Sequence, residues 1–269
     1  MNPKKIFRYL SILTKYIIVK IFNKLFFLNN LKVIPSLESL NFSRIQYSSK
    51  SRRYIFRNRS NKIEKIIIDT SLLESDLCIL GKKYNTPKSS LNDGHRVGYT
   101  GFYSLIFAGI KNNKINLAEI GIDQNGSSKM WRKYFKNANI YLFEYDKNKI
   151  NNAKKDRLKK TSYHFTNVTS RKEITKSFKK LNKKFDIIID DSTHFLRDQV
   201  NVINSTFDFL NPGSFLIIED IYKRYNENDY NIALGNLKKK FKKVIFIEVY
   251  NSNNYSASWR NEKLLVLIK

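Results

Sequence analysis

The feature that most limits the fold of this chain is a regular alternation of strand and helix patterns that begins at Asn116. Short apolar runs alternate with segments of helical apolar spacing, which predicts a parallel sheet with helices on both faces. The last two strands follow each other without a helix between them, so we expect an antiparallel hairpin at the C-terminus. The predicted strands are 117–121, 139–144, 162–167, 185–190, 214–219, 243–250 and 262–269, and the predicted helices are 127–135, 147–158, 171–181, 194–210 and 229–241. The sequence therefore predicts an α/β fold with a doubly wound, mostly parallel seven-stranded sheet.

Residues 1–62 precede this region and differ from it in composition. Residues 1–34 combine apolar residues with basic ones, and the lysines interrupt every run that would be long enough to span a membrane. The pattern favours an amphipathic helix with a basic face, which would lie on an anionic membrane, contact a partner or pack on the body of the same protein. Residues 35–62 are rich in Ser, Arg and Asn and are typical of a linker. We therefore expect a basic N-terminal helical extension and linker over 1–62.

Residues 63–114 are predicted to form a cap or lid segment ahead of the main domain, which would span 115–269. Residues 81–98 are polar and rich in turn-forming residues, and residues 99–110 have helical apolar spacing. A segment of this kind ahead of a sheet can cover a substrate site. For His95, which lies within it, we expect a structural or surface role.

The overall charge favours anionic partners but does not identify one. The 269 residues include 50 Lys and Arg against 23 Asp and Glu, a formal net charge of +27, and such a field attracts nucleic acid, acidic membranes or anionic glycans. The lysines are scattered, however, and the sequence contains no nucleic-acid-binding motif. We therefore interpret the charge as compositional drift and do not expect a nucleic-acid partner. The single cysteine, Cys78, excludes an intramolecular disulfide and a cysteine-based zinc cluster.

Two of the predicted strands end in pairs of acidic residues. Asp190-Asp191 and Glu219-Asp220 follow apolar runs, and His194 comes three residues after Asp191. The carboxyl ends of parallel strands share one edge of a sheet, where open α/β folds bind ligands. Carboxylates and a histidine at this edge predict a metal-assisted reaction site. The alternative is structural, with the acids on the surface and Asp191 capping the helix that follows.

A glycine-containing loop joins the first strand of the alternating region to its helix. The pattern is Glu119, Gly121 and Gly126, with Asp123 where a dinucleotide-binding loop would have its second glycine. Glycines allow the backbone to approach a ligand closely. The next strand ends at Glu144, and an acid about 20 residues further on is placed to bind ribose hydroxyls. The two features together predict a site for a cationic or neutral ligand that carries a ribose, and the alternative is an ordinary tight strand–helix turn.

Together these motifs resemble class I S-adenosylmethionine-dependent methyltransferases, and more closely the metal-dependent macrolide sugar O-methyltransferases of the mycinamicin and macrocin type. The resemblance rests on KYNTPKSS…HRVGYTGFY (83–103), LAEIGIDQNGSSKMWRKYFKNANIYLFE (117–144), FDIIIDDSTHFLRDQ (185–199) and LNPGSFLIIEDI (210–221). It covers roughly residues 80–221 and implies a Rossmann-like fold whose last strand enters the sheet antiparallel.

The resemblance also implies roles for individual residues. The implied cofactor-binding residues are Glu119, Gly121, Gly126, Ser127, Glu144, Asn167 and Asp190, of which Asp190 would also shape the end of its strand. The implied ligands of a magnesium ion are Asp191, Glu219 and Asp220, since Mg²⁺ prefers hard oxygen donors. His194 would act as the general base at the acceptor hydroxyl, or orient that base, with Asp191 beside it as a second catalytic residue.

From this resemblance we expect an S-adenosylmethionine- and Mg²⁺-dependent O-methyltransferase that acts on a hydroxyl of a sugar or glycoconjugate. A membrane-lying N-terminus would suit a glycolipid or a precursor in polysaccharide biosynthesis, with the protein cytoplasmic or peripheral on a membrane. Assembly into a homo-oligomer is left open. The alternatives are a methyltransferase of a catechol-like or other small-molecule diol, and a non-catalytic nucleic-acid-binding protein with the same fold.

Overall fold

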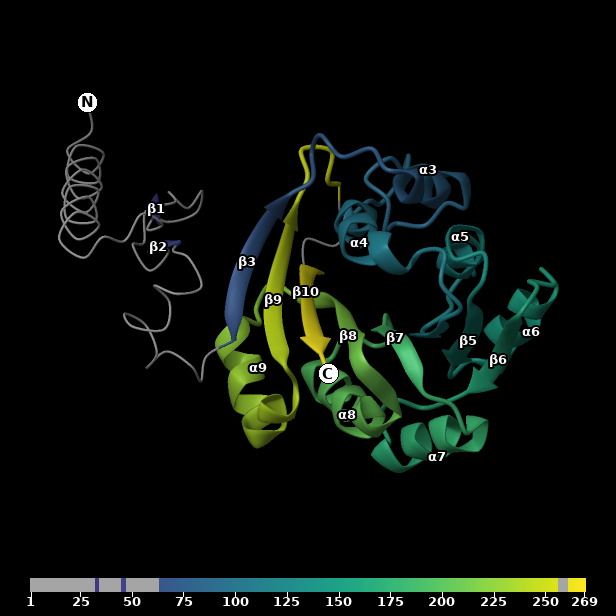
Figure 1. Ribbon diagram of the computed structural model, residues 1–269. Helices are drawn as coiled ribbons and strands as arrows, with labels where there is room; N and C mark the ends of the chain where they lie inside the picture. Colours follow the sequence, from purple (N-terminus) through teal and green to yellow (C-terminus); the bar gives the residue numbers. More distant parts are fainter. Residues whose placement is uncertain (1–31, 34–44, 47–62, 256–260) are drawn as a thin grey trace. The chain divides into compact units, whose positions relative to one another are not determined.

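The computed structural model describes residues 32–33, 45–46, 63–255 and 261–269 (Figure 1). The chain divides into two units, Met1–Asn61 and Lys62–Lys269. In the first unit, β1 (Lys32–Val33) pairs antiparallel with β2 (Ile45–Gln46). Apart from these two short strands, the predicted amphipathic helix and the predicted linker lie outside the described residues and remain predictions.

The second unit contains a sheet of eight strands in the order β3-β9-β10-β8-β7-β4-β5-β6. Neighbouring strands are parallel except for β10, which is antiparallel to both β8 and β9. The strands are β3 (Glu64–Asp69), β4 (Asn116–Ile120), β5 (Asn139–Glu144), β6 (Thr161–Phe165), β7 (Phe185–Asp190), β8 (Leu210–Tyr222), β9 (Lys243–Tyr250) and β10 (Asn261–Ile268). The predicted α/β fold, with a mostly parallel sheet and a C-terminal antiparallel hairpin, is confirmed.

The sheet has one strand more than the seven predicted. Residues 64–69, which the sequence assigns to the cap segment, form the edge strand β3 and pair in parallel with β9. The side chains of β3 are exposed or half-buried along the whole strand, so it lacks the continuous apolar run of a central strand. Its partner lies near the other end of the chain, and the local strand–helix alternation therefore gives no sign of this pairing.

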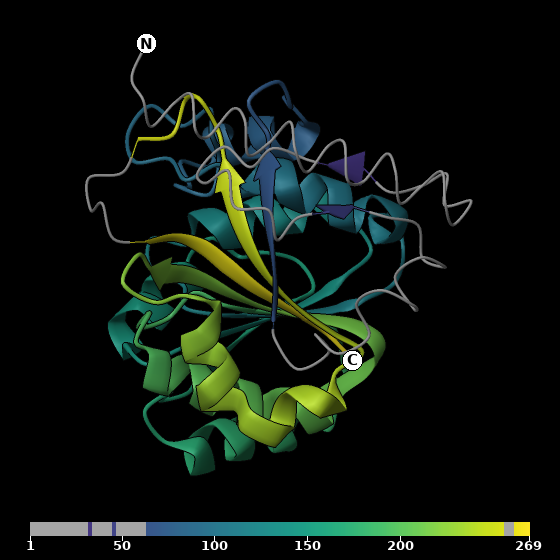
Figure 2. The ribbon, with the colours of Figure 1, turned by 90° about the vertical axis from the view of Figure 1, so that its left-hand side faces the viewer.

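Helices cover both faces of the sheet (Figure 1 and Figure 2). On one face lie α3 (Asp76–Lys83), α4 (Tyr99–Phe107), α5 (Gly126–Tyr134) and α6 (Lys147–Lys154), and on the other lie α7 (Arg171–Leu181), α8 (Leu196–Thr206) and α9 (Glu227–Leu234). Short 3-10 turns, η2 (Ala108–Ile110), η3 (Phe207–Phe209) and η4 (Gly235–Lys240), follow α4, α8 and α9. Each face has its own cluster of buried apolar side chains. Within the described ranges, no helix is long and apolar enough to cross a membrane.

Strand β7 shows how the sequence positions the acidic residues. Residues 187–189 are three fully buried isoleucines, and they alternate between the two apolar clusters. Full burial of one isoleucine contributes about 1.5–3 kcal/mol, so the register of β7 is fixed from both faces. That register aligns Asp190 with Ile120 of β4 on one side and with Ile218 of β8 on the other. The glycine loop and both acidic pairs therefore begin at the same level of the sheet.

Candidate active site

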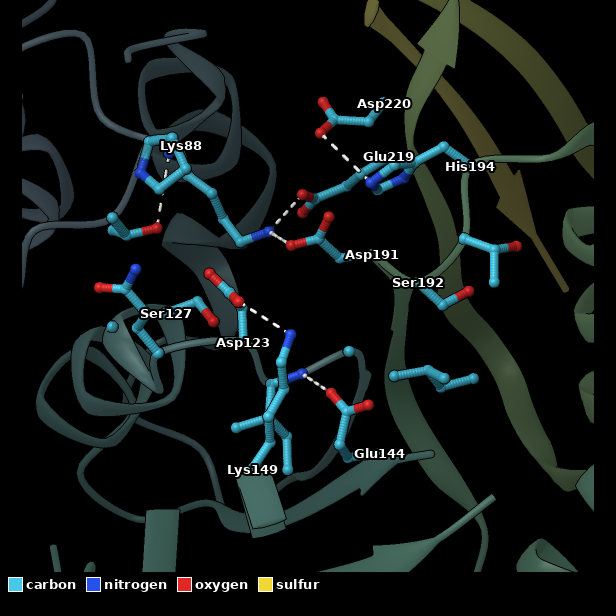
Figure 3. Close-up of a pocket in the computed structure, with 18 of the residues that line it drawn as sticks. Lys88, Asp123, Ser127, Glu144, Lys149, Asp191, Ser192, His194, Glu219 and Asp220 are labelled. Carbon is cyan, nitrogen blue, oxygen red and sulfur yellow. Dashed lines mark hydrogen bonds and ion pairs between the residues drawn. The ribbon is translucent and has the colours of Figure 1, made fainter. Parts of the chain in front are cut away.

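A cavity of about 1200 Å³ opens at the carboxyl edge of the sheet (Figure 3). The loops that follow β4, β5, β6 and β7 line it, together with β8, residues from 85–97 in the connection between α3 and α4, and Tyr99 at the start of α4. The predicted site residues that line it are Gly121, Gly126, Ser127, Glu144, Asn167, Asp191, His194, Glu219 and Asp220. Glu119 and Asp190, in contrast, are fully buried and do not line the cavity.

Gly121 and Gly126 permit close contacts between backbone segments. Gly121 has a φ of +101°, and a Cβ there would overlap the carbonyl oxygen of Asp191. A Cβ on Gly126 would lie 2.7 Å from the carbonyl oxygen of Tyr84. A larger residue would push the loop away from the end of β7 or from the connection to α4. The sequence predicts close approach to a ligand here, and the contacts that the structure describes are made by the protein's own backbone.

Glu144 holds the glycine loop against the end of β5. Its Oε2 accepts a hydrogen bond from the backbone N–H of Ile122 at 3.0 Å, and its Oε1 accepts from the N–H groups of Tyr145 and Asp146 at 2.8 and 3.0 Å. These bonds fix the carboxylate at the cavity wall (Figure 3). Because a carboxylate oxygen has two lone pairs, Oε2 can accept one further hydrogen bond, from a ligand hydroxyl.

Glu119 lies behind the loop and is shielded from the cavity. Its carboxylate accepts hydrogen bonds from Ser127 Oγ at 2.9 Å and from Trp131 Nε1 at 3.1 Å. Burial raises the pKa of Glu119 to about 6, although the nearby Lys88 acts to lower it. Glu119 therefore positions Ser127, which does line the cavity, and the start of α5.

Asn167 and Asp190 stabilise turns at the edge of the sheet. Asn167 lines the cavity, and its Oδ1 accepts hydrogen bonds from the backbone N–H and the hydroxyl of Thr169 at 3.0 and 2.8 Å. Asp190 Oδ1 accepts from Ser192 Oγ at 2.6 Å, and Oδ2 is buried with no partner among the described residues. Burial raises the pKa of Asp190 to about 7. Asp190 is thus buried behind the cavity and bonded within its own loop, whereas Asn167 lines the cavity.

Asp191, His194 and Asp220 converge on one point of the cavity. One potential ligand atom from each lies within 4.8 Å of the others, and His194 Nε2 is 3.9 Å from Asp220 Oδ2 (Figure 3). His194 and Asp220 have φ values of +59° and +52°, and such conformations cost a non-glycine residue about 1–3 kcal/mol and cluster at functional sites. His194 Nδ1 is buried, and it has no hydrogen-bond partner in the part of the chain that the structure describes.

Glu219, the remaining predicted metal ligand, points toward residues that precede the alternating region. Tyr103 OH donates a hydrogen bond to Glu219 Oε1 at 2.6 Å, and the ammonium of Lys88 bonds to Oε2. The same ammonium lies 2.5 Å from Asp191 Oδ2 (Figure 3). Glu219 is therefore held by Lys88 and Tyr103 and stands apart from the cluster of Asp191, His194 and Asp220.

The site carries an excess of negative charge. Within the described ranges, the carboxylates of Glu119, Asp191, Glu219 and Asp220 surround one ammonium, that of Lys88. Burial raises the pKa values of Glu219 and Asp220, and repulsion from Asp191 adds to the effect. A divalent cation would relieve this repulsion, and carboxylate oxygens are the ligands that Mg²⁺ prefers. The residues present therefore fit the predicted metal ion.

Lys88, Tyr99 and Tyr103 are site residues that the sequence analysis missed. Tyr99 OH donates a hydrogen bond to Asp220 Oδ1 at 2.8 Å, as Tyr103 does to Glu219. The two tyrosines are four residues apart on α4, and this spacing places them on one face of the helix. The spacing is visible in the sequence, but it does not reveal which distant carboxylates the hydroxyls reach. His95 also lines the cavity, and its expected structural or surface role remains a prediction.

The sequence matches a family model described as "Methyltransferase domain" over residues 117–262, which is more than half of the chain. The chain therefore belongs to this methyltransferase family. The matched region contains the glycine loop, both acidic strand ends and His194, and it begins after Lys88 and α4.

The individual proteins to which the chain is similar include sugar O-methyltransferases. The chain is 26% identical to 8-demethyl-8-alpha-L-rhamnosyl tetracenomycin-C 2'-O-methyltransferase of Streptomyces olivaceus, over 52% of this chain and 39% of that protein. It is 24% identical to Mycinamicin VI 2''-O-methyltransferase of Micromonospora griseorubida, over 60% of this chain and 40% of that protein. The chain thus spans about 40% of the length of these relatives. The predicted resemblance to macrolide sugar O-methyltransferases is confirmed.

A solved structure shows the same fold. The MycE methyltransferase from the mycinamycin biosynthetic pathway, in complex with Mg, SAH and mycinamycin VI, aligns with a TM-score of 0.53 and 19% identity. The alignment covers 72% of this chain and 54% of that chain. At this identity the likeness concerns the fold, and it confirms the predicted Rossmann-like architecture.

Proposed function

We propose that the protein transfers the methyl group of S-adenosylmethionine to a hydroxyl of a sugar or glycoconjugate, and that Mg²⁺ takes part. The observation that carries this proposal is the meeting of two sets of residues in one cavity. The glycine loop and Glu144 form one set, and Asp191, His194 and Asp220 form the other. Membership of the methyltransferase family and the sugar O-methyltransferases among the relatives support it.

The cofactor half is assigned to Glu144 and the loop that it anchors. S-adenosylmethionine, when bound, supplies a methyl group that a nucleophile can attack. Glu144 Oε2 would accept a hydrogen bond from a ribose hydroxyl, because it has acceptor capacity beyond its bond to Ile122. The loop 121–126 and Ser127 line the same wall and would contact the rest of the cofactor.

The acceptor half is assigned to the acidic cluster and His194. A sugar hydroxyl is a poor nucleophile at neutral pH, and Mg²⁺, when bound by Asp191, Glu219 and Asp220, lowers the pKa of a hydroxyl that it contacts. His194 would remove the proton, because an imidazole can accept one near neutral pH. Asp220, whose Oδ2 lies 3.9 Å from His194 Nε2, would orient the ring and stabilise the imidazolium.

Aromatic side chains beside His194 provide a surface for the acceptor. Tyr222 lines the cavity, and its ring meets the rings of His194 and Phe195 edge-on at centroid distances of 6.4 and 6.1 Å. Phe195 is 51% exposed, and exposed aromatic surface beside a polar pocket is typical of a ligand site. We assign the sugar ring to this surface, with its reactive hydroxyl toward His194. The predicted glycolipid or polysaccharide precursor, the membrane contact through residues 1–34 and homo-oligomerisation remain predictions.

Calorimetric titration with S-adenosylmethionine tests the cofactor half. Wild-type protein should bind the cofactor, and Glu144→Ala should weaken binding about tenfold or more, because a hydrogen bond to a charged group contributes about 1.5–3 kcal/mol. Glu173→Ala, an exposed position on α7, is the matched control and should bind like wild type. A folded wild-type protein that binds no S-adenosylmethionine would overturn the proposed function.

A further inference from the structure

Lys88 is a buried lysine that contacts carboxylates from three strands of the sheet. Its side chain is 3% exposed, and its ammonium bonds to Glu219 Oε2 and lies 2.5 Å from Asp191 Oδ2 and 3.7 Å from Glu119 Oε1. Glu219 belongs to β8, Asp191 directly follows β7, and Glu119 belongs to β4. Lysine is almost never fully buried unless it is paired, so the position of Lys88 depends on these acids.

The backbone around Lys88 is tied to the two helices that flank it. The carbonyl oxygen of Lys88 accepts a hydrogen bond from the N–H of Thr100 in α4 at 3.0 Å. The next residue, Ser89, donates from its hydroxyl to the carbonyl oxygen of Cys78 in α3 at 2.7 Å. A Cβ on Gly81 would lie 2.6 Å from Ser89 Cβ, which shows how closely this turn packs on α3. The backbone therefore holds the Lys88 side chain in a fixed position beside the acidic cluster.

The contacts of Lys88 overlap with those that a metal ion would need. Its ammonium bonds to oxygens of Asp191 and Glu219, two of the residues assigned above to Mg²⁺. Two cations that share carboxylates repel each other, and the repulsion is strong where water is excluded. The ammonium of Lys88 therefore occupies a position beside the metal site, on two of the carboxylates that would hold the ion.

We propose that Lys88 is a positioning residue that competes with Mg²⁺ for the carboxylates of Asp191 and Glu219 and so keeps the affinity of the site for the metal low. The inference rests on the proposed function. Lys88 keeps the acidic cluster assembled before a metal ion arrives. An acceptor whose oxygen atoms also contacted a weakly held ion would add to the stability of that ion, so the ion and the acceptor would each strengthen the binding of the other.

Titration calorimetry with Mg²⁺ tests this competition on the full chain. Lys88→Met keeps an unbranched side chain, one atom shorter than lysine, and removes the charge. The variant should bind Mg²⁺ about tenfold more tightly or better, because a nearby like charge is gone. Lys88→Arg keeps the positive charge, so its affinity for Mg²⁺ should stay closer to that of wild type than the affinity of Lys88→Met does. Lys83→Met, at an exposed position of α3, removes one charge away from the cluster and should also stay within about threefold. Unchanged or weaker Mg²⁺ binding by Lys88→Met would overturn the proposal, as would equal tightening by Lys83→Met.

The stability of Lys88→Met provides a second readout. Removal of the ammonium leaves the carboxylates without their buried counter-ion, so the ion-free variant should melt at a lower temperature than wild type. Mg²⁺ should then raise the melting temperature of Lys88→Met by more than that of wild type, because the ion binds the folded state. If the variant is unfolded without Mg²⁺ and the ion does not restore its native circular dichroism, the proposal is wrong. Methyl transfer by wild type that persists in EDTA would instead remove the metal from the proposed function and this inference with it.

Discussion

Replacement of Gly121 by alanine should lower the free energy of unfolding more than replacement of any exposed glycine does. The new methyl group would overlap the carbonyl oxygen of Asp191 and lie 2.7 Å from its carbonyl carbon, and both atoms belong to backbone at the end of β7. The left-handed φ of +101° adds about 1–3 kcal/mol of strain, and overpacking adds a further cost of about 1–3 kcal/mol. We therefore expect Gly121→Ala to lower the free energy of unfolding by about 2–6 kcal/mol.

Two other glycines separate these contributions. Gly213 has a φ of +79° and no described atom within 4 Å of its Cβ position, so Gly213→Ala should show the backbone strain alone. Gly109 has neither feature, and Gly109→Ala should be neutral or slightly stabilising. Urea unfolding followed by circular dichroism gives the three free energies. If Gly121→Ala is no less stable than Gly213→Ala, the close approach of the glycine loop to Asp191 is not as described.

Two further substitutions test buried polar groups of the site. The pKa of Asp190 is about 7 instead of 3.8, so the folded state keeps a proton that the unfolded state loses, and stability should fall as the pH rises from about 4 to about 7. Urea unfolding at the two pH values gives the change in the free energy of unfolding. Asp190→Asn should reduce this change by up to about 4 kcal/mol, and an equal change in variant and wild type would contradict the prediction. Tyr103→Phe should lower the free energy of unfolding, measured by thermal denaturation, by about 1.5–3 kcal/mol. The reason is that the buried Glu219 Oε1 loses the hydrogen bond from the Tyr103 hydroxyl. Tyr145→Phe, at a 64% exposed position, is the control for this substitution. An equal loss of stability in both variants would contradict the buried hydrogen bond between Tyr103 and Glu219.

The central part of the fold could be predicted from local patterns in the sequence. Residues 187–189 are three isoleucines that point alternately to the two faces of the strand, and the two apolar clusters bury them. Their parallel pairing determines where the acidic ends meet. Edge strand β3 could not be predicted in this way, because its side chains are half exposed and its partner β9 is distant in the sequence.

The sequence predicts which acidic residues end the strands, but it does not predict which way their side chains point or which distant residues they contact. The sequence places Asp190 and Asp191 at one strand end, but neighbouring residues of a strand point to opposite faces. Only the structure shows that Asp191 faces the cavity and Asp190 does not. Lys88 is one of many lysines in the chain, and its partners lie 103 and 131 positions away, so no local pattern distinguishes it.

Methyl transfer from S-adenosylmethionine to nucleotide sugars, glycolipids and catechols, each with Mg²⁺ and with EDTA, tests the two-part cavity most directly. If the glycine loop and Glu144 hold the cofactor while Asp191, Glu219 and Asp220 hold the ion, a sugar hydroxyl should be methylated in Mg²⁺ and left unmodified in EDTA. Methylation of a sugar that continues unchanged in EDTA would contradict the metal assignment. Absence of transfer to every sugar acceptor by a folded protein with Mg²⁺ present would contradict the proposed function as a whole.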